Sequence, residues 1–281
     1  MLSPKIRRLE QNNRFIRSLF YILRKTNTSF QNLKFEVKAR LRVLGFEDKN
    51  YVKIKKIKNI YNNARCFIIA TGPSLTIEDM EKLKNEYTFG MNSICLIFDR
   101  TDFRPSYFGI QDVHVYEKVK KNLSAYCKEN VFVSSNICKV YNTPKEWIKF
   151  PLNLSYHAFQ IRYGQEYFAK FSDDCYNVVY DGSSITYSLI QIAAYMGFQE
   201  IYLLGCDCSY SDDKNKQHFI ETGHYDPTYK TAGERMIAAY KAAKEYADAH
   251  GIKIYNATRG GMLEVFPRVD LDEVLGVKEI K

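Results

Sequence analysis

Short apolar runs alternate with helical segments along most of this 281-residue chain, from residue 66 to residue 258. Each apolar run is five to seven residues long, and the segments between the runs have helical periodicity. Strands that alternate with helices form a parallel sheet, because each connection must cross over a face of the sheet. The pattern therefore predicts an α/β fold with a doubly wound, mostly parallel, Rossmann-like sheet. The predicted strands are residues 66–71, 87–92, 107–112, 131–135, 201–207 and 253–258, and the predicted helices are residues 76–84, 113–127, 183–197 and 231–251.

Residues 1–60 depart from the alternation and predict a basic, amphipathic helical extension. They hold the clusters "KIRR", "KAR" and "KIKKIK" and a periodic run that ends at Gly45. Such an extension can lie on an anionic membrane surface. It can also pack against the main domain or join two subunits of a homo-oligomer, and the sequence leaves these alternatives open. The rest of the chain, residues 61–281, is predicted to be one catalytic domain, with an aromatic-rich lid or insertion at 139–181.

The bulk composition limits the class of protein. Apolar residues make up 46% and charged residues 26%, as in ordinary globular proteins, and the net charge is +9. The seven cysteines form no CxxC pair, their number is odd, and no secretory signal precedes them, so we expect free thiols in a cytoplasmic protein. No apolar run is long enough to span a bilayer, so any membrane contact is expected to be peripheral, at the inner face of the cell membrane. The positive charge lies in the extension without a nucleic-acid-reading motif, so we expect no nucleic-acid partner.

Small polar residues follow each predicted strand. In an open parallel sheet, ligands bind in the crevice at the carboxyl ends of the strands. Six such groups in succession favour a polar ligand pocket, although asparagine and serine are also common in turns. The groups are Gly72, Pro73 and Ser74, then Asn92, then Gln111 and Asp112, then Asn136, then Asp207, and finally Asn256, Thr258, Arg259, Gly260 and Gly261.

Two turns before helices suit a phosphate or carboxylate. Gly72 allows a ligand to approach the backbone closely, and Ser74 or Thr76 can cap the following helix. The turn lacks the three spaced glycines of the dinucleotide fingerprint and the Gly-Lys-Ser/Thr of the P-loop, which argues against a typical NAD enzyme and a Walker-type ATPase. The second such start is formed by Gly182, Ser183 and Ser184.

The loop after the fifth strand supplies the catalytic candidates. Asp207 ends a buried strand, where a carboxylate is costly unless it is paired or functional. His224, and after it His218, are candidate general bases, because histidine titrates near neutrality. A loop histidine that is simply solvated is the alternative. Cys206 and Cys208 flank Asp207 as a lone CxC pair without a second spaced pair, and we predict no metal site there.

The segments "FIIATGPSL", "GMN", "ITYSLIQIAAYMGFQEIYLLGCDCSY" and "GIKIYNATRGGMLEVFPRVDLDEVL" resemble a bacterial superfamily over roughly residues 64–275. It contains the 6-hydroxymethylpterin diphosphokinase-like proteins of domain of unknown function 115 and the family 42 sialyltransferases. The resemblance implies a sialyltransferase-like variant of the GT-A fold. It also implies that Gly72, Pro73, Ser74, Asn92, Asn136 and the Ser183 region contact the nucleotide of a CMP-sugar.

The same resemblance bears on the catalytic loop. It implies that Tyr210 lies near the donor phosphate and that a downstream histidine is the general base. The pair His224-Tyr225 matches that motif, although the family's histidine falls a few residues later, where this sequence has Thr228 or Tyr229. The carboxyl-terminal segment is more similar to the uncharacterised branch of the superfamily.

The sequence thus predicts a glycosyltransferase that moves a sugar from a nucleotide-activated donor, with a CMP-sugar favoured. The acceptor is expected to be a glycan or lipid-linked molecule in bacterial capsule or lipopolysaccharide synthesis. No Asp-x-Asp motif is present, so we expect metal independence and no cofactor. One alternative is an ATP-dependent 6-hydroxymethylpterin diphosphokinase with magnesium on Asp207, Asp212 or Asp213. Another is a non-catalytic polysaccharide-assembly protein.

Overall fold

The computed structural model describes residues 12–163, 166–209, 218–220 and 229–276. The chain divides into two compact units, residues 1–46 with 153–167 and residues 47–152 with 168–281. The sequence predicted a boundary at residue 60, whereas residues 47–60 group with the second unit. Ile54 in this segment is fully buried, and its helix packs beside a strand of the sheet. The domain limits and the lid at 139–181 remain predictions.

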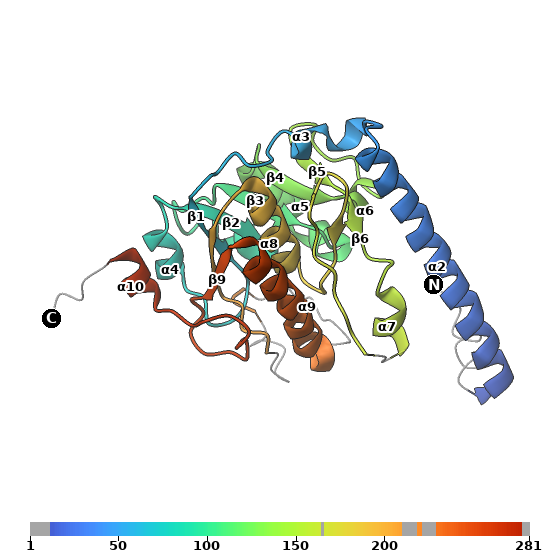
Figure 1. Ribbon diagram of the computed structural model, residues 1–281. Coiled ribbons are helices and arrows are strands. Elements are labelled where there is room, and N and C mark those ends of the chain that lie inside the picture. The colour runs from blue at the N-terminus through green and yellow to red at the C-terminus, as the bar shows by residue number, and fades with distance from the viewer. Residues whose placement is uncertain (1–11, 164–165, 210–217, 221–228, 277–281) are drawn as a thin grey trace. The chain divides into compact units, whose positions relative to one another are not determined.

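A seven-stranded sheet forms the centre of the second unit, and all of its neighbouring strands are parallel (Figure 1). The strand order is β5-β4-β3-β2-β1-β8-β9. The strands are β1 (Arg65–Ile69), β2 (Tyr87–Met91), β3 (Tyr107–Ile110), β4 (Val131–Ser134), β5 (Ile148–Phe150), β8 (Glu200–Leu204) and β9 (Lys253–Asn256). The predicted doubly wound, mostly parallel α/β fold is confirmed, and each of the six predicted strands is present.

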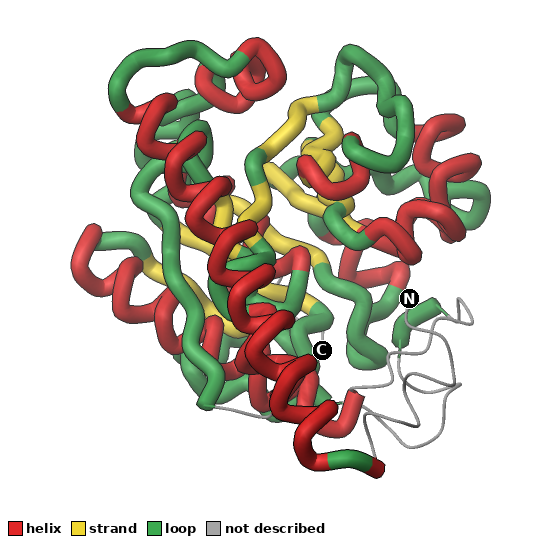
Figure 2. Tube along the Cα trace, turned by 90° about the vertical axis from the view of Figure 1, so that its right-hand side faces the viewer, coloured by secondary structure: helices red, strands yellow, loops and turns green. Residues whose placement is uncertain are grey.

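Helices cover both faces of this sheet, and Figure 2 shows the strands in yellow between them. Phe67 and Ile69 of β1 pack into one core cluster with residues of α4 (Ile77–Lys82), η2 (Asn92–Ile97) and α5 (Val113–Tyr126). Side chains alternate along a strand, so Ile68 between them points to the other face. There α8 and α9 pack, and a Cβ added to Gly109 of β3 would meet Leu189 of α8 at 2.8 Å. These helices and the shorter ones are η1 (Lys49–Tyr51), α3 (Val52–Lys55), α4 (Ile77–Lys82), η2 (Asn92–Ile97), α5 (Val113–Tyr126), α6 (Ser135–Cys138), α8 (Ile185–Met196), α9 (Tyr229–His250) and α10 (Leu271–Leu275).

Local capping explains where the helices begin and end. Thr76 and Asp79 form a reciprocal capping box at the start of α4. Ser184 caps α8, whose other end is closed by Gly197 in the left-handed conformation at φ 96°. The four predicted helices of the sheet unit all exist within a few residues of their predicted limits.

The segment predicted to be an irregular insertion contains one strand of the main sheet. Strand β5 pairs with β4, and Phe132 lies opposite Ile148. With only three residues at the edge of the sheet, β5 is too short for its sequence to show a strand pattern. A separate two-stranded sheet follows, formed by β6 (Leu152–Asn153) and β7 (Val179–Tyr180).

The first unit consists of the long helix α2 (Arg14–Val43) and the short helix α7 (Ala158–Tyr163). The ring of Tyr21 meets that of Phe159 edge-on at 4.8 Å, and Asn153 Nδ2 donates to Asn32 Oδ1 at 3.0 Å. The helical extension predicted from the amino-terminal periodicity is therefore present. Within the described part of the chain, no helix combines the length and apolar character that a bilayer crossing needs. All seven cysteines are free thiols, as predicted.

Candidate functional site

The carboxyl ends of the parallel strands form one edge of the sheet, and the chain changes direction there between β1 and β8. Strands β1 to β5 follow one another outward in order, and the chain then crosses to β8 on the other side of β1. Such a switch point is where α/β sheets bind ligands. The predicted site residues within the described part of the chain lie at this edge or beside it. They are Gly72, Pro73 and Ser74 after β1, Asn92 after β2, Gln111 and Asp112 after β3, Asn136 after β4, Gly182, Ser183 and Ser184 before α8, and Asp207 after β8.

Ser74 and Asp207 join the two strands of the switch point. Ser74 Oγ donates a hydrogen bond to Asp207 Oδ2 at 2.8 Å. Asp207 is only 7% exposed. Burial raises the pKa of its carboxyl group, and the hydrogen bond from Ser74 opposes that shift without cancelling it. The sequence predicted that this carboxylate is either paired or functional. The structure shows that it is paired with Ser74, and its catalytic role stays a prediction.

Gly72 is required by the protein's own packing. A Cβ atom at this position would lie 1.9 Å from Asp207 Oδ2 and 2.4 Å from the carbonyl oxygen of Gly205. The backbone N–H of Gly72 also donates to that carbonyl at 2.9 Å. The sequence predicted that this glycine makes room for a ligand. The structure shows that the Asp207 carboxylate fills this space.

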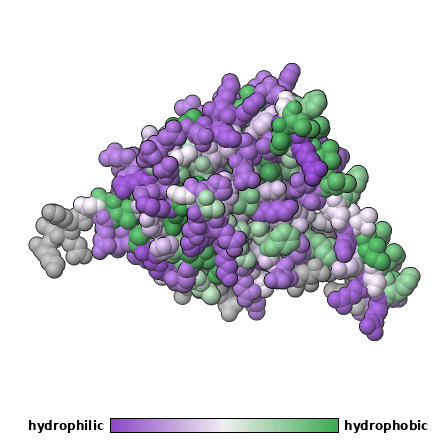
Figure 3. Space-filling model, viewed as in Figure 1, coloured by the Kyte–Doolittle hydropathy of each residue, from purple (hydrophilic) through white to green (hydrophobic). Residues whose placement is uncertain are grey.

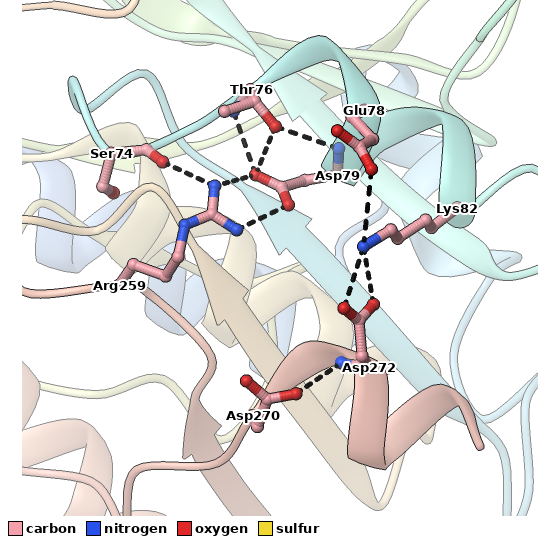
Figure 4. A network of polar contacts seen from close by, with 8 residues as sticks. All are labelled: Ser74, Thr76, Glu78, Asp79, Lys82, Arg259, Asp270 and Asp272. Atoms are coloured by element: carbon pink, nitrogen blue, oxygen red, sulfur yellow. Dashed lines mark hydrogen bonds and ion pairs between the residues drawn. The ribbon is translucent and has the colours of Figure 1, made fainter. Parts of the chain in front are cut away.

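Arg259 holds the turn between β1 and α4 in place (Figure 4). Its guanidinium donates to both carboxylate oxygens of Asp79, at 2.8 and 2.5 Å, and to the carbonyl oxygen of Ser74 at 3.0 Å. Asp79 also accepts from the Thr76 hydroxyl at 2.8 Å. Burial alone would raise the pKa of Asp79, but the hydrogen bonds from Arg259 and Thr76 outweigh it and the pKa is lowered. Sequence reasoning included Arg259 among the strand-end residues but did not find Asp79, which looked like an ordinary helix residue.

A cavity of about 660 Å³ adjoins this network. Its lining includes Thr258, Arg259 and Gly260 of the sixth predicted strand-end group and no residue of the other five groups. Its cationic side chains are all paired: Lys82 with Asp272 at 2.7 Å, Arg268 with Glu264 at 2.6 Å, and Arg259 with Asp79. An anion would have to compete with these carboxylates. We therefore place the candidate site at the switch point and the ends of β2 to β4.

Gln111 links the end of β3 to the start of α8. Its Nε2 donates to Asp181 Oδ1 at 3.0 Å, and its Oε1 accepts from Ser188 Oγ at 2.7 Å. The same Asp181 accepts from the backbone N–H of Ser183 at 3.2 Å, and Ser183 has a left-handed φ of 62°. These bonds fix the turn before α8. Gln111 therefore has a structural role as well as a place in the predicted pocket.

Two other predicted residues are helix caps. Asp112 accepts from the backbone N–H groups of His114 and Val115 at 2.8 Å each, at the start of α5. Ser184 accepts from the N–H of Thr186 at 3.2 Å, at the start of α8. Helix capping explains why a polar side chain occupies each of these two positions, and no ligand is needed to explain it.

Asn92 and Asn136 each bury one amide atom that has no hydrogen-bond partner among the described residues. These atoms are Asn92 Oδ1 and Asn136 Nδ2. The other amide atom of Asn136, Oδ1, accepts from Lys139 Nζ at 3.3 Å. Leaving a buried polar atom unpaired costs about 1–3 kcal/mol, so such atoms in native proteins call for a partner. A polar ligand at the ends of β2 and β4 would supply it.

The remaining predicted residues belong to the loop after β8. Tyr210, His224 and Tyr225 lie outside the described residues. His218 is described, and the N–H of the adjacent Phe219 donates to the carbonyl oxygen of Thr71 at 2.8 Å. This bond brings the loop back to the end of β1. In the described ranges, no three histidine, cysteine, aspartate or glutamate side chains gather as a metal site.

Comparison with known proteins gives one family and one solved structure. The sequence profile of the family "6-hydroxymethylpterin diphosphokinase MptE-like" matches residues 46–213. The sialyltransferase CstII from Campylobacter jejuni, solved with cytidine-5'-monophosphate, is a structural match with 13% sequence identity and a TM-score of 0.33. The match covers 73% of this chain and 84% of that one. No curated protein matches the sequence significantly.

Proposed function

The chain belongs to the 6-hydroxymethylpterin diphosphokinase MptE-like family, and within it we propose a transferase that uses a nucleotide-activated sugar, preferably a CMP-sugar. The donor would bind along the carboxyl ends of β1, β2, β4 and β8. The acceptor would be a hydroxyl group of a glycan or a lipid-linked molecule in surface polysaccharide synthesis. The preference for CMP comes from the resemblance of the Gly72-Pro73-Ser74 turn and the following asparagines to those of sialyltransferases.

The pair of unpartnered amide atoms carries this proposal. Asn92 Oδ1 needs a donor and Asn136 Nδ2 needs an acceptor. A nucleotide offers both kinds of group on its base and ribose. A simple anion offers only acceptors, so it would leave Asn92 Oδ1 unpaired.

In the proposed reaction, the acceptor oxygen attacks the anomeric carbon while the bond from that carbon to the phosphate oxygen breaks. The acceptor proton passes to a general base, for which His224 is our first candidate and His218 the second. The nucleotide leaves with the bonding electron pair. Tyr210 would donate to its phosphate. Asp207 would hold Ser74 and the turn after β1 in position.

Thermal unfolding of the full chain with CMP, UDP, GDP and ATP, each with and without Mg²⁺, tests the donor. We expect CMP to raise Tm by about 5 °C at a hundredfold excess over its Kd, without magnesium. Asn92→Gly and Asn136→Ala should each remove most of that shift. Gly fits the left-handed φ of 50° at position 92 without strain. A chain that no nucleotide stabilises would contradict the proposal and favour a non-catalytic assembly protein.

The general base is tested by activity. His224→Ala should abolish sugar transfer and leave the CMP-induced shift in Tm unchanged, because the base contacts the acceptor and not the nucleotide. His218→Ala is the matched control. If His224→Ala keeps full transferase activity and His218→Ala loses it, the assignment passes to His218.

Family membership favours a second candidate function, the transfer of pyrophosphate from ATP to a pterin alcohol. This reaction needs Mg²⁺. Asp207 is the candidate ligand in the described part of the chain, and Asp212 and Asp213 lie outside it. Stabilisation by ATP only in the presence of magnesium, with none by CMP, would favour this function over the glycosyltransferase.

A further inference from the structure

Helix α2 carries a row of apolar side chains that are exposed along its whole length. The row consists of Phe15, Leu19, Ile22, Phe30, Leu33, Val37, Leu41 and Leu44, which are between 42% and 77% exposed. Figure 3 shows hydrophobic side chains gathered on the surface over α2. A helix of a globular domain normally turns its apolar side toward a core. The exposed row is large enough to require a partner.

The row follows an eleven-residue repeat. Its positions are 15, 19, 22, then 26, 30, 33, then 37, 41, 44, and only Thr26 is polar. Eleven residues in three turns give 3.67 residues per turn, close to the 3.6 of a straight helix. The row therefore stays on one side of α2 for about 45 Å, the length of a 30-residue helix.

The opposite side of α2 is the one that packs within its own unit. The ring of Tyr21 meets that of Phe159 edge-on, and Asn32 accepts from Asn153, and both partners belong to the same unit as α2. At 100° per residue, Tyr21 and Asn32 lie roughly opposite the centre of the apolar row. The row is therefore not the face by which α2 packs in its unit.

The charge of α2 identifies the occupant of this face. The helix contains one acidic residue, Glu36, and eight basic residues. Arg42 is buried, and the other seven, Arg14, Arg17, Arg24, Lys25, Lys34, Lys38 and Arg40, are exposed or half-buried. A straight apolar row on a strongly basic helix fits the surface of an anionic bilayer, where apolar side chains enter the interface and basic ones meet lipid phosphates. We infer that α2 binds flat on an anionic lipid surface through the face formed by Phe15, Leu19, Ile22, Phe30, Leu33, Val37, Leu41 and Leu44.

A second copy of the chain is the competing occupant, because eleven-residue repeats also form right-handed coiled coils. Pairing two α2 helices through this face would bring two strongly basic segments together. Only Glu36 in each helix could compensate them. Charge complementarity therefore favours lipid over self-association.

Binding of the full chain to sedimented vesicles tests the inference. We expect binding to phosphatidylcholine vesicles that contain 30% phosphatidylserine, and at least tenfold weaker binding to pure phosphatidylcholine, since each basic side chain near the surface contributes about fivefold. The double variant Leu19→Glu/Leu33→Glu should lower the partition coefficient on anionic vesicles at least tenfold. Both leucines are exposed, so the variant is expected to fold, and its far-UV circular dichroism and Tm check this.

The matched control is Asn27→Glu/Gln31→Glu, which adds the same charge at exposed positions away from the apolar row. It should stay within about threefold of the unmodified chain. No binding to anionic vesicles, or an equal loss in both double variants, would overturn the inference. So would a dimer in light scattering that dissociates only in Leu19→Glu/Leu33→Glu while vesicles remain unbound, because a second copy would then occupy the face.

Discussion

The two halves of the carboxyl edge differ in how their buried polar groups are satisfied. Around β1, β8 and β9, the groups are paired: Ser74 with Asp207, and Arg259 with Asp79. At the ends of β2 and β4, Asn92 and Asn136 bury amide atoms that have no partner within the part of the chain that the structure describes. The first half is complete in the folded chain. The second half leaves hydrogen bonds unmade that a ligand can form.

This difference separates residues that build the edge from residues that serve a ligand. Removing one member of a buried pair leaves the other unsatisfied and lowers the free energy of unfolding. Removing an unpaired group instead removes the desolvation penalty that this group adds to the folded state. Stability and ligand binding should therefore respond oppositely in the two halves, and the following substitutions test this.

The largest effect is expected from Gly72→Ala. The new methyl group would collide with Asp207 Oδ2, which a hydrogen bond from Ser74 holds in place, and with the backbone carbonyl oxygen of Gly205, which cannot rotate away as a side chain could. We expect a loss of about 3 kcal/mol in the free energy of unfolding, measured by urea denaturation. Gly251→Ala is the control: it has open space around its Cβ but a φ of +69°, so its cost should be about 1 kcal/mol. Equal costs would show that Asp207 does not crowd Gly72.

Arg259→Ala should follow, at about 2 kcal/mol. Among the described residues, it leaves the buried carboxylate of Asp79 with only Thr76 as a side-chain partner. Arg259→Lys should recover part of this loss and not all of it, because a lysine cannot donate to both carboxylate oxygens in the same fork. Full recovery by lysine in urea denaturation would mean that charge alone, without the two-pronged geometry, holds the turn.

A smaller contrast is expected between Ser74→Ala, which should lower stability, and Asn136→Ala, which should lower ligand binding. Ser74→Ala removes the donor to buried Asp207 and should cost about 1–2 kcal/mol. Asn136→Ala removes an unpaired Nδ2 and should change the free energy of unfolding by less than about 0.5 kcal/mol, while it weakens CMP binding at least tenfold. Isothermal titration calorimetry with CMP measures the affinity of each variant for the nucleotide. A destabilising Asn136→Ala with unchanged CMP affinity would remove the distinction between the two halves.

The smallest expected effect is a pH dependence with opposite signs at Asp207 and Asp79. Because folding raises the pKa of Asp207, its protonated carboxyl group contributes to the free energy of unfolding. This contribution is complete below the unfolded pKa of about 3.9 and is lost as pH rises through the folded pKa. Because folding lowers the pKa of Asp79, its ionised carboxylate also contributes to the free energy of unfolding. This contribution is present above the unfolded pKa of about 3.9 and is lost as pH falls through the folded pKa. Relative to the unmodified chain, Asp207→Asn should therefore gain stability as pH rises from 3 to 7, and Asp79→Asn should lose it. Parallel pH profiles would contradict the assigned directions.

The sequence predicted the sheet well because parallel strands buried on both faces are continuous apolar runs. "CFIIAT" and "IYLLGCD" are such runs, and they lie side by side as β1 and β8. Strand β5 was missed because three residues show no periodicity. The polar strand ends were predicted from the same rule, and all described members lie at or beside the expected edge.

The roles of individual polar residues were harder to predict, because they depend on partners distant in sequence. Nothing local shows that Asp79 meets Arg259 or that Gly72 faces Asp207. Asn92 and Asp112 looked equally suitable for a ligand, yet Asp112 caps a helix and Asn92 buries an unpaired oxygen. Pairing in three dimensions separates these cases.

The central position of β1 has a consequence for synthesis of the protein. Its Arg65 pairs with Glu200 of β8, so one edge of β1 stays unpaired until the ribosome has made more than two thirds of the chain. An apolar strand with a free edge invites pairing with other nascent chains. Chains that end before residue 200 should therefore aggregate, whereas folding of the complete protein must await its last third.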